Sequence, residues 1–263
     1  LGTQSVWGWH SFPNTENLKV EEAQKVYELE GRKISYTVQP KEGGRVKMAV
    51  EYFRVNPHRL QLGNIGLEIK KKDGTLAIAD DIKHINQELD LWTGIITSSF
   101  TVEGIPVKVR TVCNQQVDVV TFQIESLLLN QKRISIRARF PYPNAQFKDV
   151  GNNWMNDDAH SSVASFGHNS VFINRTLDQF KYKTSLYWSD KSVVQEKSKH
   201  YFLITPESAK NNRYELTCLF EGKKALTVLT GFKAVSKNSS NAWKKFWLSG
   251  GAVDFSDTKD QRA

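Results

Sequence analysis

The amino-acid sequence predicts an all-β fold in which short antiparallel strands form a sandwich or a barrel. Apolar and polar residues alternate through several short segments, and turn residues separate these segments at regular intervals. Helical periodicity is weak until the end of the chain. With 263 residues, the chain is long enough to bury a core as one large all-β domain or as two smaller ones.

The clearest strand pair lies in the middle of the chain. A strand pattern over residues 91–102 runs into Glu103-Gly104, and a second pattern follows over residues 105–112. Because a tight turn needs a positive φ angle, Gly104 favours a hairpin at this point.

Further segments read as strands in the same way. In residues 133–140, every second side chain is apolar, so Ile134, Ile136, Ala138 and Phe140 are predicted to point into the core. The other predicted strands cover residues 67–71, 117–124, 162–166, 170–175, 181–189, 201–205, 214–220 and 226–231.

A helix is predicted only near the end of the chain. Trp243, Phe246 and Trp247 fall at positions i, i+3 and i+4, so their rings share one face. The sequence offers glycines at 250 and 251 to end this helix. The candidate N-terminal caps are Ser239, Ser240 and Asn241.

Charge and composition exclude some classes of partner. The net charge is +8, but the lysines are scattered along the chain, so we expect no nucleic-acid partner. No apolar run approaches the length of a membrane span, and we expect none. The chain starts at Leu1 rather than Met, which is compatible with a removed leader. The pair Cys113 and Cys218 matches no metal or redox spacing, and a disulfide between them stays open.

Two polar and aromatic loops are candidates for ligand binding. The segment Trp7-Gly-Trp-His-Ser-Phe-Pro13 places Trp9 beside His10, and an exposed tryptophan can stack on a sugar ring. A second loop carries His58 and Arg59, which could bind an anion. The alternative is structural: the tryptophans would cover the edge of a sandwich, and His58 and Arg59 would hydrogen-bond to loop carbonyl groups.

No motif specifies a complete catalytic site. Asp157 and Asp158 lie beside His160, but adjacent aspartates in a strand point to opposite faces, and this segment reads as a loop. The sequence contains no nucleophile elbow, phosphate loop or zinc spacing. We therefore assign no catalytic residue and expect neither a cofactor nor a metal.

Four segments together resemble a known family. They are Trp7–Asn14, Asn56–Leu67, Asp90–Ile96 and the final segment from Trp243 to Phe255. These segments resemble the N-terminal portion of bacterial, Bacteroides-type, six-hairpin glycoside hydrolases, which are distantly similar to glycoside hydrolase family 65. The resemblance spans nearly the whole chain, although its motifs are diffuse.

The resemblance implies an antiparallel two-sheet supersandwich of the galactose-mutarotase-like kind. Residues 1–235 would form this domain, and residues 236–263 would form a linker helix leading toward an (α/α)6 barrel. In such enzymes the barrel carries the catalytic carboxylates, and this chain does not contain it. Trp243, Phe246 and Trp247 would then lie at the domain interface, while Trp9, His10, His58 and Arg59 would belong to a substrate-binding loop.

The resulting expectation is a non-catalytic scaffold domain of a glycoside hydrolase that degrades polysaccharide. Its partners would be an oligosaccharide or polysaccharide and the catalytic barrel of the same protein, in the periplasm or outside the cell. One alternative is a free-standing carbohydrate-binding module. Another is an aldose-mutarotase-like epimerase, which would need a glutamate and a histidine on one sheet face, with His58, His84 and His168 as candidates.

Overall fold

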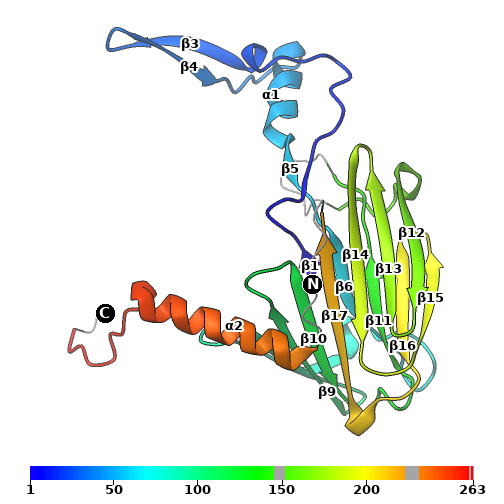
Figure 1. Cartoon of the computed structure of the whole chain (residues 1–263). Coiled ribbons are helices and arrows are strands. Elements are labelled where there is room, and N and C mark those ends of the chain that lie inside the picture. Colours follow the sequence, from blue (N-terminus) through cyan, green and yellow to red (C-terminus); the bar gives the residue numbers. More distant parts are fainter. Residues whose placement is uncertain (145–151, 223–230, 261, 263) are drawn as a thin grey trace. The chain divides into compact units, whose positions relative to one another are not determined.

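The structure is a computed structural model that describes residues 1–144, 152–222, 231–260 and 262 (Figure 1). Backbone contacts divide the chain into two units. The first unit comprises residues 1–64 and 140–160, and the second comprises residues 65–139 and 161–263. Short ribbons and one helix build the first unit, whereas large sheets and the C-terminal helix build the second.

The first unit is made of short elements. Two antiparallel ribbons occur in it, one formed by β2 with β5 and the other by β3 with β4. Its elements are β1 (Gly2–Thr3), β2 (Trp9–His10), the 3-10 helix η1 (Val20–Ala23), β3 (Gln24–Leu29), β4 (Arg32–Thr37), α1 (Arg45–Val55), β5 (His58–Arg59) and the 3-10 helix η3 (Asp157–Ala159).

Helix α1 was not expected from the sequence. Ala49 and Val50 are its buried residues, and they pack with Leu18 and Ala23 in a small core. Because its apolar stripe is this narrow, the helical period is hard to recognise in the sequence. The residue before the helix is Gly44, which supplies no side-chain cap, so the usual start signal is missing too.

The second unit contains two antiparallel sheets. The larger has eight strands in the order β12-β13-β14-β17-β10-β9-β8-β7, and β6, β11, β16 and β15 are neighbours in the smaller. The strands are β6 (Gly63–Ile69), β7 (Ile82–Asp90), β8 (Ile95–Val102), β9 (Ile105–Cys113), β10 (Val119–Glu125), β11 (Ile134–Arg139), β12 (His160–Gly167), β13 (Ser170–Leu177), β14 (Phe180–Trp188), β15 (Ser192–Ser198), β16 (Tyr201–Pro206) and β17 (Arg213–Glu221).

These sheets confirm the predicted all-β sandwich. Ile134, Ile136 and Ala138 are buried on β11, as the alternation predicted. On the larger sheet, Leu186 and Leu216 are fully buried, so both sheets contribute one apolar face to the core. The hairpin at Glu103-Gly104 is also confirmed, with a φ angle of +77° at Gly104.

Some strand predictions differ from the structure. The pattern over 91–102 becomes a strand only at Ile95, because Gly94 N donates a hydrogen bond of 2.7 Å to Asp90 O and closes a turn. Strands β7 and β15 were missed, since most of their side chains are exposed and their apolar pattern is weak. Most of the strand predicted over residues 226–231 lies outside the described residues.

Helix α2 (Phe232–Phe246) continues into a π-helical turn, Trp247–Gly251, and lies across β9 and β10 (Figure 1). It starts earlier than predicted: the N-cap is Gly231, so the caps proposed at 239–241 are wrong. Ser239 is instead a buried residue inside the helix. The end is as predicted, because Gly250 has a φ angle of +100°. None of the described helices is long and apolar enough to span a membrane.

Candidate functional site

The ribbon of β2 and β5 holds the four residues predicted to bind substrate. Trp9 pairs with Arg59, and His10 pairs with His58. Because neighbouring residues of a strand point to opposite faces, the ribbon presents Trp9 and Arg59 on one face and the two histidines on the other. Exposure agrees with this division: Trp9 is 44% exposed, whereas His10 is only 4% exposed.

Trp9 and Arg59 form a stacked pair on the outer face. The guanidinium carbon of Arg59 lies 4.6 Å from the centre of the Trp9 ring, within the range of a cation–π interaction. Arg59 Nη1 donates to Ser5 O at 2.7 Å, and Trp9 Nε1 donates to Val6 O at 2.9 Å. These bonds fix both side chains, so an aromatic surface is held in place at the protein surface.

His10 and His58 form a hydrogen-bonded pair on the inner face. His58 Nδ1 lies 2.9 Å from Val55 O, and a carbonyl only accepts, so this nitrogen carries a proton. In neutral His58, Nε2 is then an acceptor, and it receives the hydrogen from His10 Nδ1 at 3.2 Å. Burial lowers the pKa of His58, and the neighbouring His10 lowers this pKa further.

Aromatic rings surround this histidine pair within the first unit. Phe12 stacks on His58 with ring centres 5.2 Å apart, and Tyr142 lies 6.2 Å from His10. The sequence analysis missed both as members of this cluster. Phe12 lies in the same aromatic segment as Trp9 and His10, so the sequence could have indicated that it belongs to this cluster. Tyr142 is about 130 positions away in the sequence, and no local pattern connects it to these residues.

The predicted interface residues of α2 lie together in the second unit. The rings of Trp243 and Trp247 stack with centres 6.0 Å apart, and Phe246 lies 4.9 Å from Trp247. Trp92, from the turn between β7 and β8, joins this group at 6.4 Å from Trp247. The prediction that the three helical rings share one face is therefore confirmed. The sequence analysis did not predict that Trp92 also belongs to this group.

The group continues into an apolar surface, which we call the α2 patch and define as Leu91, Trp92, Phe246 and Leu248. Their exposed fractions are 57%, 53%, 50% and 69%. Ser239 Oγ donates to Thr93 O at 2.8 Å, and this bond ties the helix to the turn that carries Trp92. The patch is thus both apolar and rigidly supported.

Two glutamates of β17 on the larger sheet have structural partners. Glu215 accepts hydrogen bonds from Gln123 Nε2 at 2.7 Å and from Phe232 N at 2.9 Å, so it caps α2. Glu221 accepts from Ser185 Oγ at 3.0 Å and pairs with Lys183 at 3.2 Å. Both groups therefore have the partners that a half-buried or buried carboxylate needs.

Of the three histidine candidates for epimerase chemistry, His58 lies in the ribbon of β2 and β5, and His84 and His168 lie in the second unit. His84 Nδ1 is 3.0 Å from Thr101 Oγ1 on β8, and His168 is exposed in the turn between β12 and β13. Among the described residues, neither hydrogen-bonds to a glutamate.

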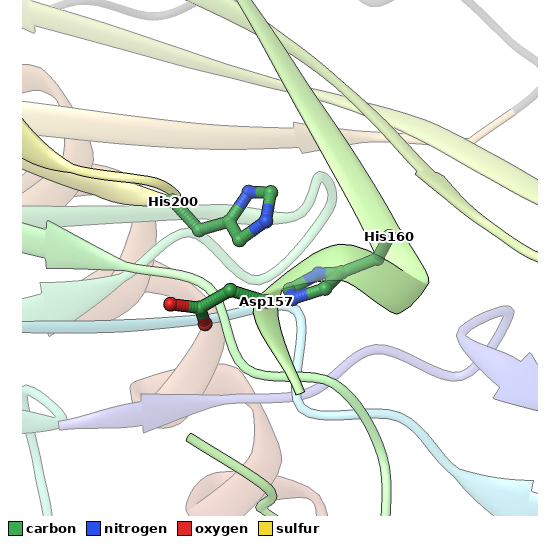
Figure 2. A group of neighbouring side chains, drawn as sticks. All are labelled: Asp157, His160 and His200. Carbon is green, nitrogen blue, oxygen red and sulfur yellow. The ribbon is translucent and has the colours of Figure 1, made fainter. Parts of the chain in front are cut away.

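Figure 2 shows Asp157 in η3, His160 at the first residue of β12, and His200 in the turn between β15 and β16. Asp157 and His160 belong to the first unit and His200 to the second. Within the first unit, the two side chains would supply two ligands, whereas zinc sites use three or four protein ligands. The expectation that the chain holds no metal stays a prediction.

Known proteins give few comparisons for this chain. A scan against protein-family models finds no match, and a search of curated proteins finds none. One similar solved structure is assigned as a kojibiose phosphorylase from the human microbiome, with 10% identity and a TM-score of 0.43 over 76% of this chain and 27% of that one. A bacterial glucoamylase complexed with acarbose has 9% identity and a TM-score of 0.48 over 72% and 33%. The chain spans about a third or less of the length of these structures.

Proposed function

We propose that the chain is a non-catalytic scaffold domain of a glycoside hydrolase and packs against a catalytic (α/α)6 barrel. The observation that carries the scaffold role is the α2 patch. The glycan part of the proposal comes from the sequence segments that resemble six-hairpin glycoside hydrolases. Carbohydrate is then the substrate of the whole enzyme, and the barrel is the partner of this domain.

The composition of the α2 patch is that of a protein interface. Four large apolar side chains at least half exposed lie at the end of α2 and on the turn that Trp247 contacts, and exposed apolar patches commonly mark binding surfaces. Aromatic residues are also enriched in the centres of such interfaces. Lys244 and Lys245 are exposed beside the patch and would form a polar rim.

The distribution of acidic groups also favours a scaffold. Glycoside hydrolysis needs two carboxyl groups that face the scissile bond, one of them free to donate a proton. Glu215 instead accepts a hydrogen bond from Phe232 N at the start of α2. Glu221 accepts a hydrogen bond from Ser185 and forms an ion pair with Lys183. We expect the catalytic carboxylates to lie outside this domain, as the resemblance to six-hairpin glycoside hydrolases implies.

A free-standing carbohydrate-binding module is the second candidate. The observation in its favour is Trp9, whose exposed ring is held by Arg59 and could stack on a sugar. In the scaffold proposal, the exposed face of the β2–β5 ribbon would contact the substrate bound by the whole enzyme. A periplasmic or secreted location belongs to both candidates and remains a proposal.

The scaffold proposal is tested on the full-length product of the gene. Phe246→Ser removes one exposed ring of the α2 patch, and Phe166→Ser is a matched control because Phe166 is 62% exposed on β12. Phe246→Ser should lower the unfolding midpoint of the full-length product more than that of the isolated chain, whereas Phe166→Ser should affect both alike. If Phe246→Ser has the same effect in both, the α2 patch is no domain interface.

A further inference from the structure

The first unit contains a half-open cavity of about 260 Å³ between η1, the β3–β4 ribbon and α1. Ala23, Val50 and Phe53 form its apolar floor. The remaining lining residues are Val20, Gln24, Thr37, Gln39 and Arg54. Cavities that hold drug-sized ligands start at about 300 Å³, so this volume suits one smaller molecule.

The cavity walls are fixed by hydrogen bonds on several sides. Arg45 forms a bidentate pair with Glu22, at 2.6 Å and 3.0 Å, which joins the start of α1 to η1. Val38 N donates to Ala23 O at 3.0 Å, and Arg54 Nη2 donates to Gln39 Oε1 at 2.7 Å. The cavity is therefore a built feature of this unit rather than a gap between loose segments.

Polar groups with spare hydrogen-bonding capacity line the cavity. Gln24 Oε1 accepts a hydrogen bond from Ser35 Oγ, and Gln39 Oε1 accepts one from Arg54. Because a guanidinium only donates, the bond from Arg54 fixes which end of the Gln39 amide is the nitrogen. Gln24, Thr37 and Gln39 are exposed at the open side of the cavity, and no hydrogen-bond partner for their amide nitrogens or for the Thr37 hydroxyl is present among the described residues. Two amide donors and a hydroxyl thus adjoin an apolar floor.

We propose that this cavity binds one sugar residue of a neutral carbohydrate. A sugar ring has an apolar face, which Val50 and Phe53 can cover, and hydroxyl groups, which the amides of Gln24 and Gln39 can bind. A hexose has about a dozen non-hydrogen atoms, which matches a cavity just below the drug-sized range. The site uses none of the residues predicted from the sequence and does not depend on the scaffold proposal.

The test is an NMR titration of the ¹⁵N-labelled chain with glucose, galactose, mannose and xylose. At least one sugar should shift the side-chain amide signals of Gln24 and Gln39 saturably, with a dissociation constant on the order of 1 mM. If none of the four sugars shifts these two amides, the proposal is wrong.

Two variants and a control locate the binding site. Thr37→Trp places a large ring at the cavity and should weaken binding at least about tenfold, and Gln39→Ala should weaken it without filling the cavity. Gln87→Ala is the matched control, because Gln87 lies on β7 and donates to Ser98 at 2.8 Å. Binding that survives both Thr37→Trp and Gln39→Ala would place the sugar elsewhere and overturn the inference.

Discussion

The indole nitrogen of Trp247 donates a hydrogen bond of 2.7 Å to the main-chain carbonyl oxygen of Leu91. This bond connects the end of α2 to the turn between β7 and β8, which lies 156 positions earlier in the chain. The stacking of Trp247 with Trp243 extends the same connection along the helix. This bond therefore supports the α2 patch, and a phenylalanine at position 247 could not make it.

Trp247→Phe should reduce the free energy of unfolding by about 1 kcal/mol more than Trp92→Phe does, because both variants exchange an indole for a phenyl ring and only Trp247→Phe also loses a hydrogen bond. Urea denaturation measures this change. Trp92→Phe is the matched control, since no hydrogen bond from the Trp92 indole is present among the described residues. Equal losses in the two variants would mean that the bond to Leu91 contributes nothing.

Gly94→Ala should destabilise the chain through both the backbone and a clash. Gly94 has a φ angle of +68°, and a Cβ atom there would overlap the Trp243 indole nitrogen and lie 2.8 Å from Ser239 Oγ. Gly104→Ala separates the two effects, because Gly104 has a φ angle of +77° but nothing within 4 Å of such an atom. We expect a loss of about 1–2 kcal/mol for Gly104→Ala and clearly more for Gly94→Ala in thermal or urea denaturation. Similar losses would show that the Trp243 contact is not tight.

Cys113 and Cys218 should be free thiols. They pair with Val120 from opposite sides, so two strand spacings separate them, roughly 9–10 Å, which is too far for a disulfide. Cys113 is exposed and Cys218 is buried. Partial desolvation by neighbouring atoms raises the pKa of the Cys113 thiol, and full burial raises the pKa of the Cys218 thiol. A thiol reagent should therefore modify Cys113 slowly in the folded chain and Cys218 only after unfolding. Thiols that appear only after addition of a reductant would contradict this geometry.

Acid should weaken the first unit through His58. Its folded-state pKa lies below the ordinary value of 6.5, so the unfolded chain binds the proton more readily. The stability that neutral His58 contributes is complete above pH 6.5 and is lost as the pH falls through the folded-state pKa. The drop in unfolding free energy between about pH 7.5 and about pH 5.5 should be smaller in His58→Gln than in the unaltered chain. His168→Gln is the control: because His168 lies in an exposed turn, this variant should lose as much unfolding free energy between the two pH values as the unaltered chain. If His58→Gln also loses as much as the unaltered chain, the role assigned to His58 is wrong.

The sequence predicted those parts of the fold that follow a strict two-residue period. Strands such as β11 bury every second side chain, so Ile134 and Ile136 indicate both the strand and its inward face. The ribbon of β3 and β4 was missed for the opposite reason. Most of its side chains are exposed on both faces, so no burial pattern distinguishes its two strands.

The candidate sites were predicted only where local patterns contain them. The spacing of Trp243, Phe246 and Trp247 along a helix predicts a shared face, which the ring contacts confirm. Trp9 and His10 were predicted to act together, but alternation along β2 places them on opposite faces. The cavity near Val50 has no local signature, because residues from η1, β4 and α1 meet only through tertiary packing.

The central claim is that this chain scaffolds a glycoside hydrolase without performing the chemistry. The most direct measurement compares the isolated chain with the full-length product of its gene for hydrolysis and anomer interconversion across a panel of oligosaccharides. The account predicts glycosidase activity in the full-length product and none in the isolated chain. Hydrolysis or interconversion of sugars by the isolated chain would contradict it.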